Sequence, residues 1–188
     1  GQSSTSDAED AVAIGFSAEA RAEDAVGIGS AADATAVRSV AFGARSVASG
    51  VAGIAIGSSG SNPNGLGAQS TADEAIAIGA DAIASELRTV AIGAQAQTLQ
   101  RDSIAIGSDG TDADALGAQT NGIRAIAIGS DTSASGPEAV ALGGRSSADG
   151  DGAVALGNLA QSSGTSAMAL GAGASSTNFS ATAVGAAA

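Results

Sequence analysis

The stretch Ala11-Val12-Ala13-Ile14-Gly15 decides the fold, because versions of it return along the whole chain, for example at Ser103–Gly107 and Ala153–Gly157. Its closing glycine stands at positions 15, 29, 43, 57, 79, 93, 107, 129, 143, 157, 171 and 185. Nine of the eleven intervals between these glycines are 14 residues long, and the other two are 22. Such a fixed period predicts a solenoid, in which each repeat is one unit stacked on the next.

Large and small side chains alternate within each repeat. The residue before the closing glycine is always large and apolar, and the residue three before it is Val or Ile except at Met168 and Thr182. The residue between them is Ala except at Gly27. This period of two predicts a β-strand, and a second alternation of small residues after each glycine predicts another. Two strands and two turns then make one 14-residue coil, and parallel pairing joins successive coils.

The alternation also suggests which residues form the core. We expect the large aliphatic side chains, together with Phe42 in the same column, to fill the interior of the roll. The alanines between them would then form a small apolar stripe on the outside. Because an uninterrupted apolar stripe is rarely left bare, we expect further copies of the chain to cover it around an axis parallel to the stack. The pattern itself does not fix the number of copies.

The composition argues against catalysis and against several kinds of partner. The chain has no His and no Cys, the usual residues of nucleophile–base catalysis and of zinc sites. Only chemistry by paired carboxylates remains available. We therefore expect no enzyme, no cofactor, and no catalytic or metal-ligating residue. The net charge of −12 disfavours binding to nucleic acid or to an anionic membrane surface.

The two long intervals, Gly57–Gly79 and Gly107–Gly129, share the string LGAQ. We expect one domain over residues 1–188, with excursions near 58–67 and 108–117 inserted after the main strand. Leu66 and Leu116 would point back towards the roll. The alternative is an extra, abbreviated coil in each interval. The excursions are candidate contact loops, although decoration without a ligand explains them equally well.

Two groups of charged residues also call for interpretation. Five residues before the closing glycine, the sign alternates from coil to coil through Glu74, Arg88, Asp102, Arg124 and Glu138. This column predicts a ladder of ion pairs that holds the coils in register. A second group resembles a calcium loop but lacks its spacing and its closing Glu, so we expect no metal there; it consists of Asp109, Asp112 and Asp114.

The strings AVAIG, SVAFG, GIAIG and DSIAIG at this spacing resemble the head repeats of YadA-type trimeric autotransporter adhesins. The resemblance runs from about Ala11 to Gly185. It implies an all-β fold: a homotrimer of left-handed parallel β-rolls, displayed on a stalk above a Gram-negative outer membrane. The chain would be a head fragment, and we expect its signal peptide, stalk and C-terminal membrane anchor to lie outside this sequence.

The resemblance implies bacterial attachment to host extracellular matrix or cell-surface molecules through a repetitive surface. The alternative is a structural spacer with no ligand of its own. The family motif associated with collagen is of the NSVAIG-x-x-S kind, and the nearest strings, Arg38–Gly43 and Asp102–Gly107, lack its Asn. Collagen is therefore not indicated. A hexapeptide-repeat acyltransferase is disfavoured by the 14-residue period and by the absence of His.

Overall fold

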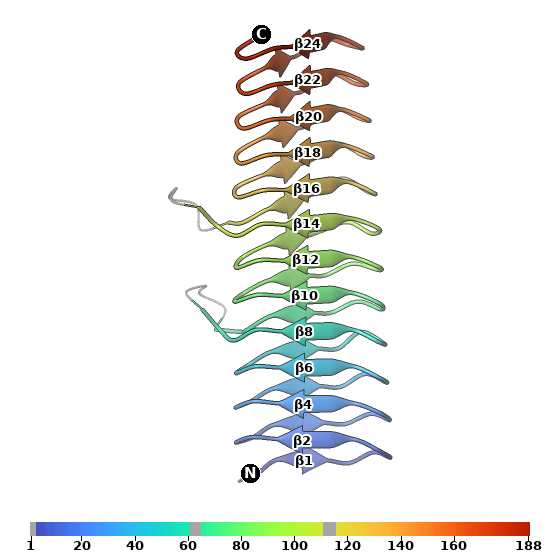
Figure 1. Ribbon diagram of the computed structural model, residues 1–188. Coiled ribbons are helices and arrows are strands. Elements are labelled where there is room, and N and C mark those ends of the chain that lie inside the picture. The colour runs from blue at the N-terminus through green and yellow to red at the C-terminus, as the bar shows by residue number, and fades with distance from the viewer. Residues whose placement is uncertain (1–2, 61–64, 111–115) are drawn as a thin grey trace. The chain divides into compact units, whose positions relative to one another are not determined.

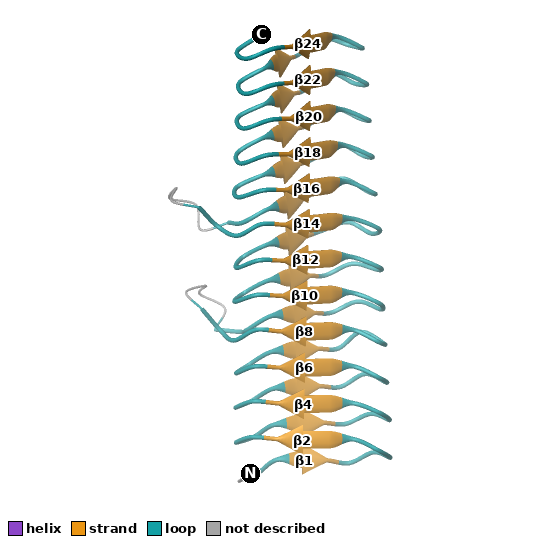
Figure 2. Ribbon diagram, in the orientation of Figure 1, coloured by secondary structure: helices purple, strands orange, loops and turns teal. Residues whose placement is uncertain are grey.

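Each repeat folds into two short β-strands joined by two tight turns (Figures 1 and 2). The computed structural model describes residues 3–60, 65–110 and 116–188, and within these ranges the regular structure is all strand. The chain divides into two units, Gly1–Gln95 and Ala96–Ala188. The predicted all-β solenoid of about twelve parallel 14-residue coils is confirmed. In the described part of the chain we find no helix of the length and apolarity needed to cross a membrane.

In the first unit, two parallel sheets run along the stack, one made of odd-numbered and one of even-numbered strands. The odd-numbered strands have two residues each: β1 (Thr5–Ser6), β3 (Glu19–Ala20), β5 (Asp33–Ala34), β7 (Val47–Ala48), β9 (Gln69–Ser70) and β11 (Ile83–Ala84). The even-numbered strands have three: β2 (Val12–Ile14), β4 (Val26–Ile28), β6 (Val40–Phe42), β8 (Ile54–Ile56), β10 (Ile76–Ile78) and β12 (Val90–Ile92).

The second unit repeats this arrangement. Its odd-numbered strands are β13 (Gln97–Thr98), β15 (Gln119–Thr120), β17 (Ser133–Ala134), β19 (Ser147–Ala148), β21 (Gln161–Ser162) and β23 (Ser175–Ser176). Its even-numbered strands are β14 (Ile104–Ile106), β16 (Ile126–Ile128), β18 (Val140–Leu142), β20 (Val154–Leu156), β22 (Met168–Leu170) and β24 (Thr182–Val184). Equivalent residues of neighbouring coils face each other, as Ile126 faces Val140.

The turns explain why positive φ recurs at the closing glycine and at the position two residues after it. In the coil that contains Arg45, the N–H of Ser46 donates to the carbonyl of Gly43 at 3.3 Å, and Arg45 between them has a φ of 60°. This is the third position of a β-turn, where a type II turn requires positive φ. The closing glycine has positive φ as well, at 132° for Gly43. Backbone bonds join the turns of adjacent coils as well, since the N–H of Arg45 donates to the carbonyl of Ser30 at 2.9 Å.

In each unit the small side chains lie inside and the large ones outside, which is the reverse of what we expected. The alanines at the centre of the even-numbered strands, such as Ala41 and Ala141, are fully buried, whereas the branched residues on either side of them point outwards. Phe42, expected in the core, is 51% exposed. The assignment of the large side chains to the interior and of the alanines to the outside was therefore wrong.

The physical reason is the small separation between the two sheets. The inward side chains in and just before the odd-numbered strands are small, such as Ala34 of β5 and Ala32 before it, which are fully buried. A β-carbon on Gly27 would already lie 2.4 Å from the carbonyl oxygen of Glu19 in the facing part of the coil. A gap that holds methyl and hydroxymethyl groups leaves no volume for Ile or Leu, so these side chains must face outwards.

The chain leaves the stack of coils after β8 and again after β14 (Figure 1). β8 nevertheless pairs directly with β10, with Ile54 facing Ile76, and β14 pairs directly with β16. Each 22-residue interval therefore advances its unit by one coil, with the additional residues placed between an even-numbered strand and the next odd-numbered strand. Residues 61–64 and 111–115 of the expected excursions lie outside the described residues. Leu66 and Leu116 are half-buried.

Candidate functional site

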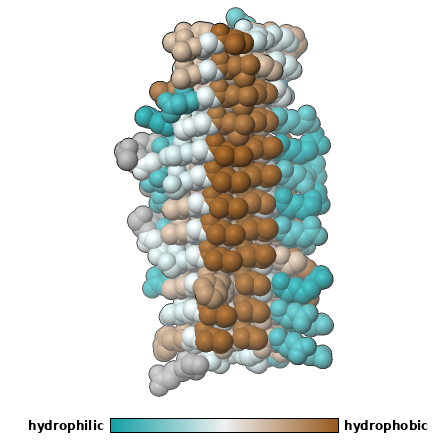
Figure 3. Space-filling model, viewed as in Figure 1, coloured by the Kyte–Doolittle hydropathy of each residue, from teal (hydrophilic) through white to brown (hydrophobic). Residues whose placement is uncertain are grey.

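The outward side chains of the even-numbered strands form an apolar stripe in each unit, which we call the apolar face. In Figure 3 it is the brown stripe that follows these strands. Its residues are partly exposed, for example Ile14 at 56% and Ile128 at 39%. Branched aliphatic side chains seldom remain in water in such continuous rows, and a patch of this kind marks an interaction surface. The outward apolar surface, which we expected to bind further copies of the chain, is thus made mainly of Val, Ile and Leu instead of Ala.

The outward side chains of the odd-numbered strands form a second surface, which we call the polar face. In the first unit this face carries Thr5, Glu19, Asp33, Val47, Gln69 and Ile83. In the second unit it carries only amides and hydroxyls: Gln97, Gln119, Ser133, Ser147, Gln161 and Ser175. The polar face of the second unit can therefore offer uncharged hydrogen-bonding groups at the regular spacing of the coils, about 4.8 Å.

Two carboxylates lie side by side on the polar face of the first unit. Glu19 and Asp33 occupy facing positions of β3 and β5, and Arg21 forms an ion pair with Glu19. Partial burial raises the pKa of Asp33, the charge of Glu19 raises it further, and Arg21 lowers it. The Oδ1 atom of Asp33 is buried and accepts no hydrogen bond from any residue that the structure describes. This end of the polar face is consequently acidic, and the two carboxylates repel each other.

The turn that precedes each even-numbered strand carries the predicted column of alternating charges. Arg124 and Glu138, from adjacent coils, form an ion pair there, as predicted. Both side chains are more than half exposed, at 62% and 59%. A solvent-exposed pair of this kind contributes little stability, on the order of 0–1 kcal/mol. The rest of the ladder, through Glu74, Arg88 and Asp102, stays a prediction.

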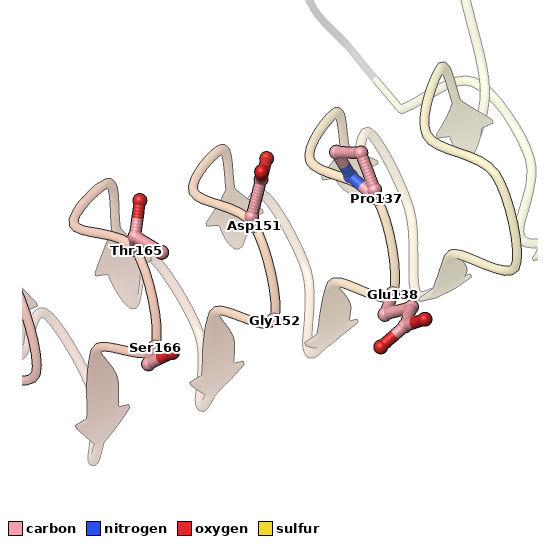
Figure 4. Close-up of a pocket in the computed structure, with 6 residues that line it drawn as sticks. All are labelled: Pro137, Glu138, Asp151, Gly152, Thr165 and Ser166. Atoms are coloured by element: carbon pink, nitrogen blue, oxygen red, sulfur yellow. The ribbon is translucent and has the colours of Figure 1, made fainter.

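Beside this ion pair the same turn of three successive coils forms a shallow groove (Figure 4). Gly152 has no side chain to fill the middle of it, and the carboxylates of Glu138 and Asp151 make it acidic. The groove is completed by Pro137, Thr165 and Ser166. Among the described residues, no group of three His, Cys, Asp or Glu side chains could hold a metal ion. Asp112 and Asp114 of the calcium-like string lie outside the described residues.

The two strings nearest to the collagen-associated motif have most of their side chains turned away from the polar face. In Asp102–Gly107, Ser103 and Ala105 are fully buried, and Ser103 accepts a hydrogen bond from the hydroxyl of Thr120 at 2.9 Å. The two isoleucines of this string belong to the apolar face. Asp102 has a φ of 60°, the left-handed conformation that Asn and Asp adopt most readily among non-glycine residues. The conformation of this position thus gives a structural reason for an Asn or Asp there.

The excursions are the part of the surface where the coil pattern is interrupted. The first one is fixed where it returns to the roll, because the N–H of Gly67 donates to the carbonyl of Arg45 at 2.8 Å. The guanidinium of Arg45 also donates to the carbonyl of Gly65 at 3.2 Å. Sequence reasoning found the excursions through their length but missed these anchors, since a backbone carbonyl acceptor leaves no mark in the sequence.

Comparison with known proteins agrees with this geometry. The family described as "YadA head domain repeat (2 copies)" matches residues 1–18, 20–46, 34–59, 65–82, 70–96, 84–109, 116–132, 121–146, 134–160 and 148–174. The comparison with individual curated proteins found no match. The matched segments cover far more than half of the chain and follow the coils of both units. The protein therefore belongs to the YadA head domain family, whose members form the repeat region of trimeric autotransporter adhesins.

Proposed function

We propose that this chain is the adhesive head of a bacterial surface fibre and attaches the cell to host extracellular matrix or cell-surface molecules. Membership of the YadA head family implies a homotrimer. The observation that carries the proposal is the division of each coil into an apolar face and a polar face, with the core between them made of small residues. The first face suits self-association and the second suits contact with a partner.

The apolar face supports self-association on energetic grounds. Burial of a branched aliphatic side chain contributes about 1.5–3 kcal/mol, and side chains that are already half-buried would still contribute roughly 1 kcal/mol each. Summed over the coils of a unit, this contribution outweighs the roughly 4–15 kcal/mol of translational and rotational freedom lost when chains associate. Because the same face is present on every copy, closed symmetry around an axis along the stack buries all copies equally.

The polar face and the excursions would remain outside such an assembly and could contact a host molecule. A repetitive surface binds by avidity, since many weak and equivalent contacts combine without any single strong site. The net charge of −12 favours partners that present a basic patch. We infer that the chain is non-enzymatic and without cofactor or metal, and that both units belong to one head displayed at the outer membrane surface. The excursions near 58–67 and 108–117 would belong to its contact surface.

The second candidate is a spacer that sets the distance between the cell and another binding domain. The observation that favours it is the uniformity of the polar face in the second unit, where six coils carry only Gln and Ser outward. A spacer would show no saturable binding to any host molecule, whereas an adhesin would.

Two measurements test the proposal on the full chain. Light scattering should give a particle of three times 17.4 kDa. The double substitution Ile126→Asn and Ile128→Asn on the apolar face should lower this mass, whereas Gln119→Asn on the polar face should not. Solid-phase binding to a panel of purified matrix proteins, collagen included, should then show saturable binding of the trimer to at least one of them. A monomeric wild-type chain, or a trimer that binds nothing, would contradict the self-association or the adhesive role respectively.

A further inference from the structure

Each excursion leaves the roll at a hydrogen bond to a carboxylate of the next coil. The N–H of Gly60 donates to Oδ1 of Asp81 at 2.7 Å. In the second unit, the N–H of Gly110 donates to Oδ1 of Asp131 at 2.6 Å. Donor and acceptor are 21 residues apart in both cases. The same contact is therefore built twice, once at the beginning of each excursion.

In ordinary coils, the position equivalent to that of Asp81 and Asp131 holds other residue types. Asp81 and Asp131 stand two residues after a closing glycine, with φ of 57° and 53°. After other closing glycines, the residues that have positive φ at this position are Ser17, Ala31, Arg45, Gln95, Arg145, Leu159, Gly173 and Ala187. A general preference of Asp for left-handed backbone would not confine it to the two coils that follow an excursion. The placement of the aspartates follows the excursions.

The glycines at the other end of each contact are matched to it. A β-carbon on Gly60 would lie 2.6 Å from Oδ2 of Asp81, and one on Gly110 would lie 2.2 Å from Oδ2 of Asp131. Only a residue without a side chain allows the carboxylate to come this close. Asp81 is also nearly buried, with 2% of its surface exposed. A buried carboxylate that accepts a backbone N–H makes a shorter and stronger bond than a neutral acceptor does.

We propose that Asp81 and Asp131 are positioning residues, each of which fixes the base of the excursion that precedes it. The carboxylate holds the described start of the excursion, at Gly60 or Gly110, against the next coil, so that the excursion leaves the roll at a defined point. The role of this anchor in presenting the excursion to a host molecule rests on the proposed function. The anchor itself does not.

Amide hydrogen exchange on the full chain, resolved to single residues, tests the anchor without any ligand. In the Asp81→Ala variant the amide of Gly60 should exchange at least tenfold faster, and the amide of Gly110 should keep its wild-type rate. In Asp131→Ala the amide of Gly110 should exchange faster and the amide of Gly60 should keep its wild-type rate. Each variant is therefore the matched control of the other. Asp81→Asn retains an Oδ1 acceptor and should preserve most of the protection at Gly60.

A structural role without positioning would give a different pattern. The amides of Gly57 and Gly79 donate to the carbonyls of Phe42 and Ile56 along the even-numbered strands. If their exchange accelerated together with that of Gly60, Asp81 would merely stabilise the coil, and the proposal would be overturned. Unchanged exchange at Gly60 in Asp81→Ala would overturn it as well. A failure of the wild-type protein to bind matrix proteins would contradict the adhesive role and leave the exchange result standing.

Discussion

Ala127 and Ala141 face each other in the ladder between β16 and β18, and neither side chain has any exposed surface. The space around them is lined by other methyl groups, and Ala125 and Ala139 beside them are equally buried. We predict that Ala141→Leu lowers the free energy of unfolding by about 3 kcal/mol, at the upper end of overpacking effects, because the sheets cannot move apart without breaking the ladder.

Thermal or denaturant unfolding of the variant measures this effect. Gln119→Leu on the polar face is the control and should change stability by less than about 0.5 kcal/mol, because it adds no volume to the interior. Equal stability of Ala141→Leu and wild type would show that the interior has room that the structure does not contain.

Two glycines that both have positive φ should differ sharply in their tolerance of substitution by alanine. Gly143 has a φ of 125°, and a β-carbon there would lie 2.6 Å from the carbonyl group of Gly157. Gly173 has a φ of 68°, and the nearest atom to its β-carbon would be 3.8 Å away. We predict that Gly143→Ala costs about 3 kcal/mol or more, whereas Gly173→Ala costs about 1 kcal/mol. Unfolding midpoints of the two variants compare them directly, and a reversed order would contradict the turn geometry.

The ion pair between Arg124 and Glu138 should be weak but real. Because both side chains are more than half exposed, we predict a coupling energy below about 0.5 kcal/mol. A double-mutant cycle with Arg124→Ala and Glu138→Ala in the full chain measures it, and about 0.5 M salt should reduce it further. If the column holds the coils in register, reversing Arg88 and Arg124 to Glu together should lower trimer stability, because like charges would then stand in adjacent coils. Unchanged trimer stability would leave the column without this role.

Asp33 should make the protein less stable at neutral pH than at acidic pH. Burial and the charge of Glu19 raise its pKa in the folded state above the ordinary 3.8. The folded state therefore holds this proton more tightly than the unfolded chain does, and the stability that this provides is lost as the pH rises above 3.8. We predict that Asp33→Asn stabilises the protein at pH 7 by roughly 0.5 kcal/mol, after allowance for solvent screening.

The gain from Asp33→Asn should shrink towards zero below about pH 3.8, where Asp33 is protonated in both states. Unfolding curves at pH 7 and pH 3 test the sign. The variant Asp7→Asn, which lies on an exposed position of the same unit, is the control. A gain that is independent of pH would show that the effect is not electrostatic.

Most of the fold could be predicted from the repeat period. It predicts the two strands, the two turns and the parallel pairing of Val12 with Val26 one coil later. It could not tell which side of the strand is inside, because an alternation of Val, Ala and Ile has the same period seen from either face. The decisive clue lay in the second strand. Ala18 and Ala20, beside and in the second strand of that coil, are fully buried, and the sheets lie so close that the first strand also has room for small inward side chains only.

The anchors of the excursions were beyond sequence reasoning for a different reason. The contact between Gly60 and Asp81 joins positions 21 residues apart through a backbone amide, and neither residue type is unusual near a turn. The repeat alignment places an aspartate two residues after Gly79 and Gly129, but the structure is needed to show that each carboxylate accepts a hydrogen bond from the start of an excursion.

The in-register ladder has an evolutionary consequence. Since every coil offers its neighbours the same backbone donors and acceptors, a coil can be duplicated or deleted in a single genetic event without disturbing those on either side. Each such event would change the height of the head by about 4.8 Å. The length of the repeat region could then be selected in whole steps, independently of the residues on its polar face.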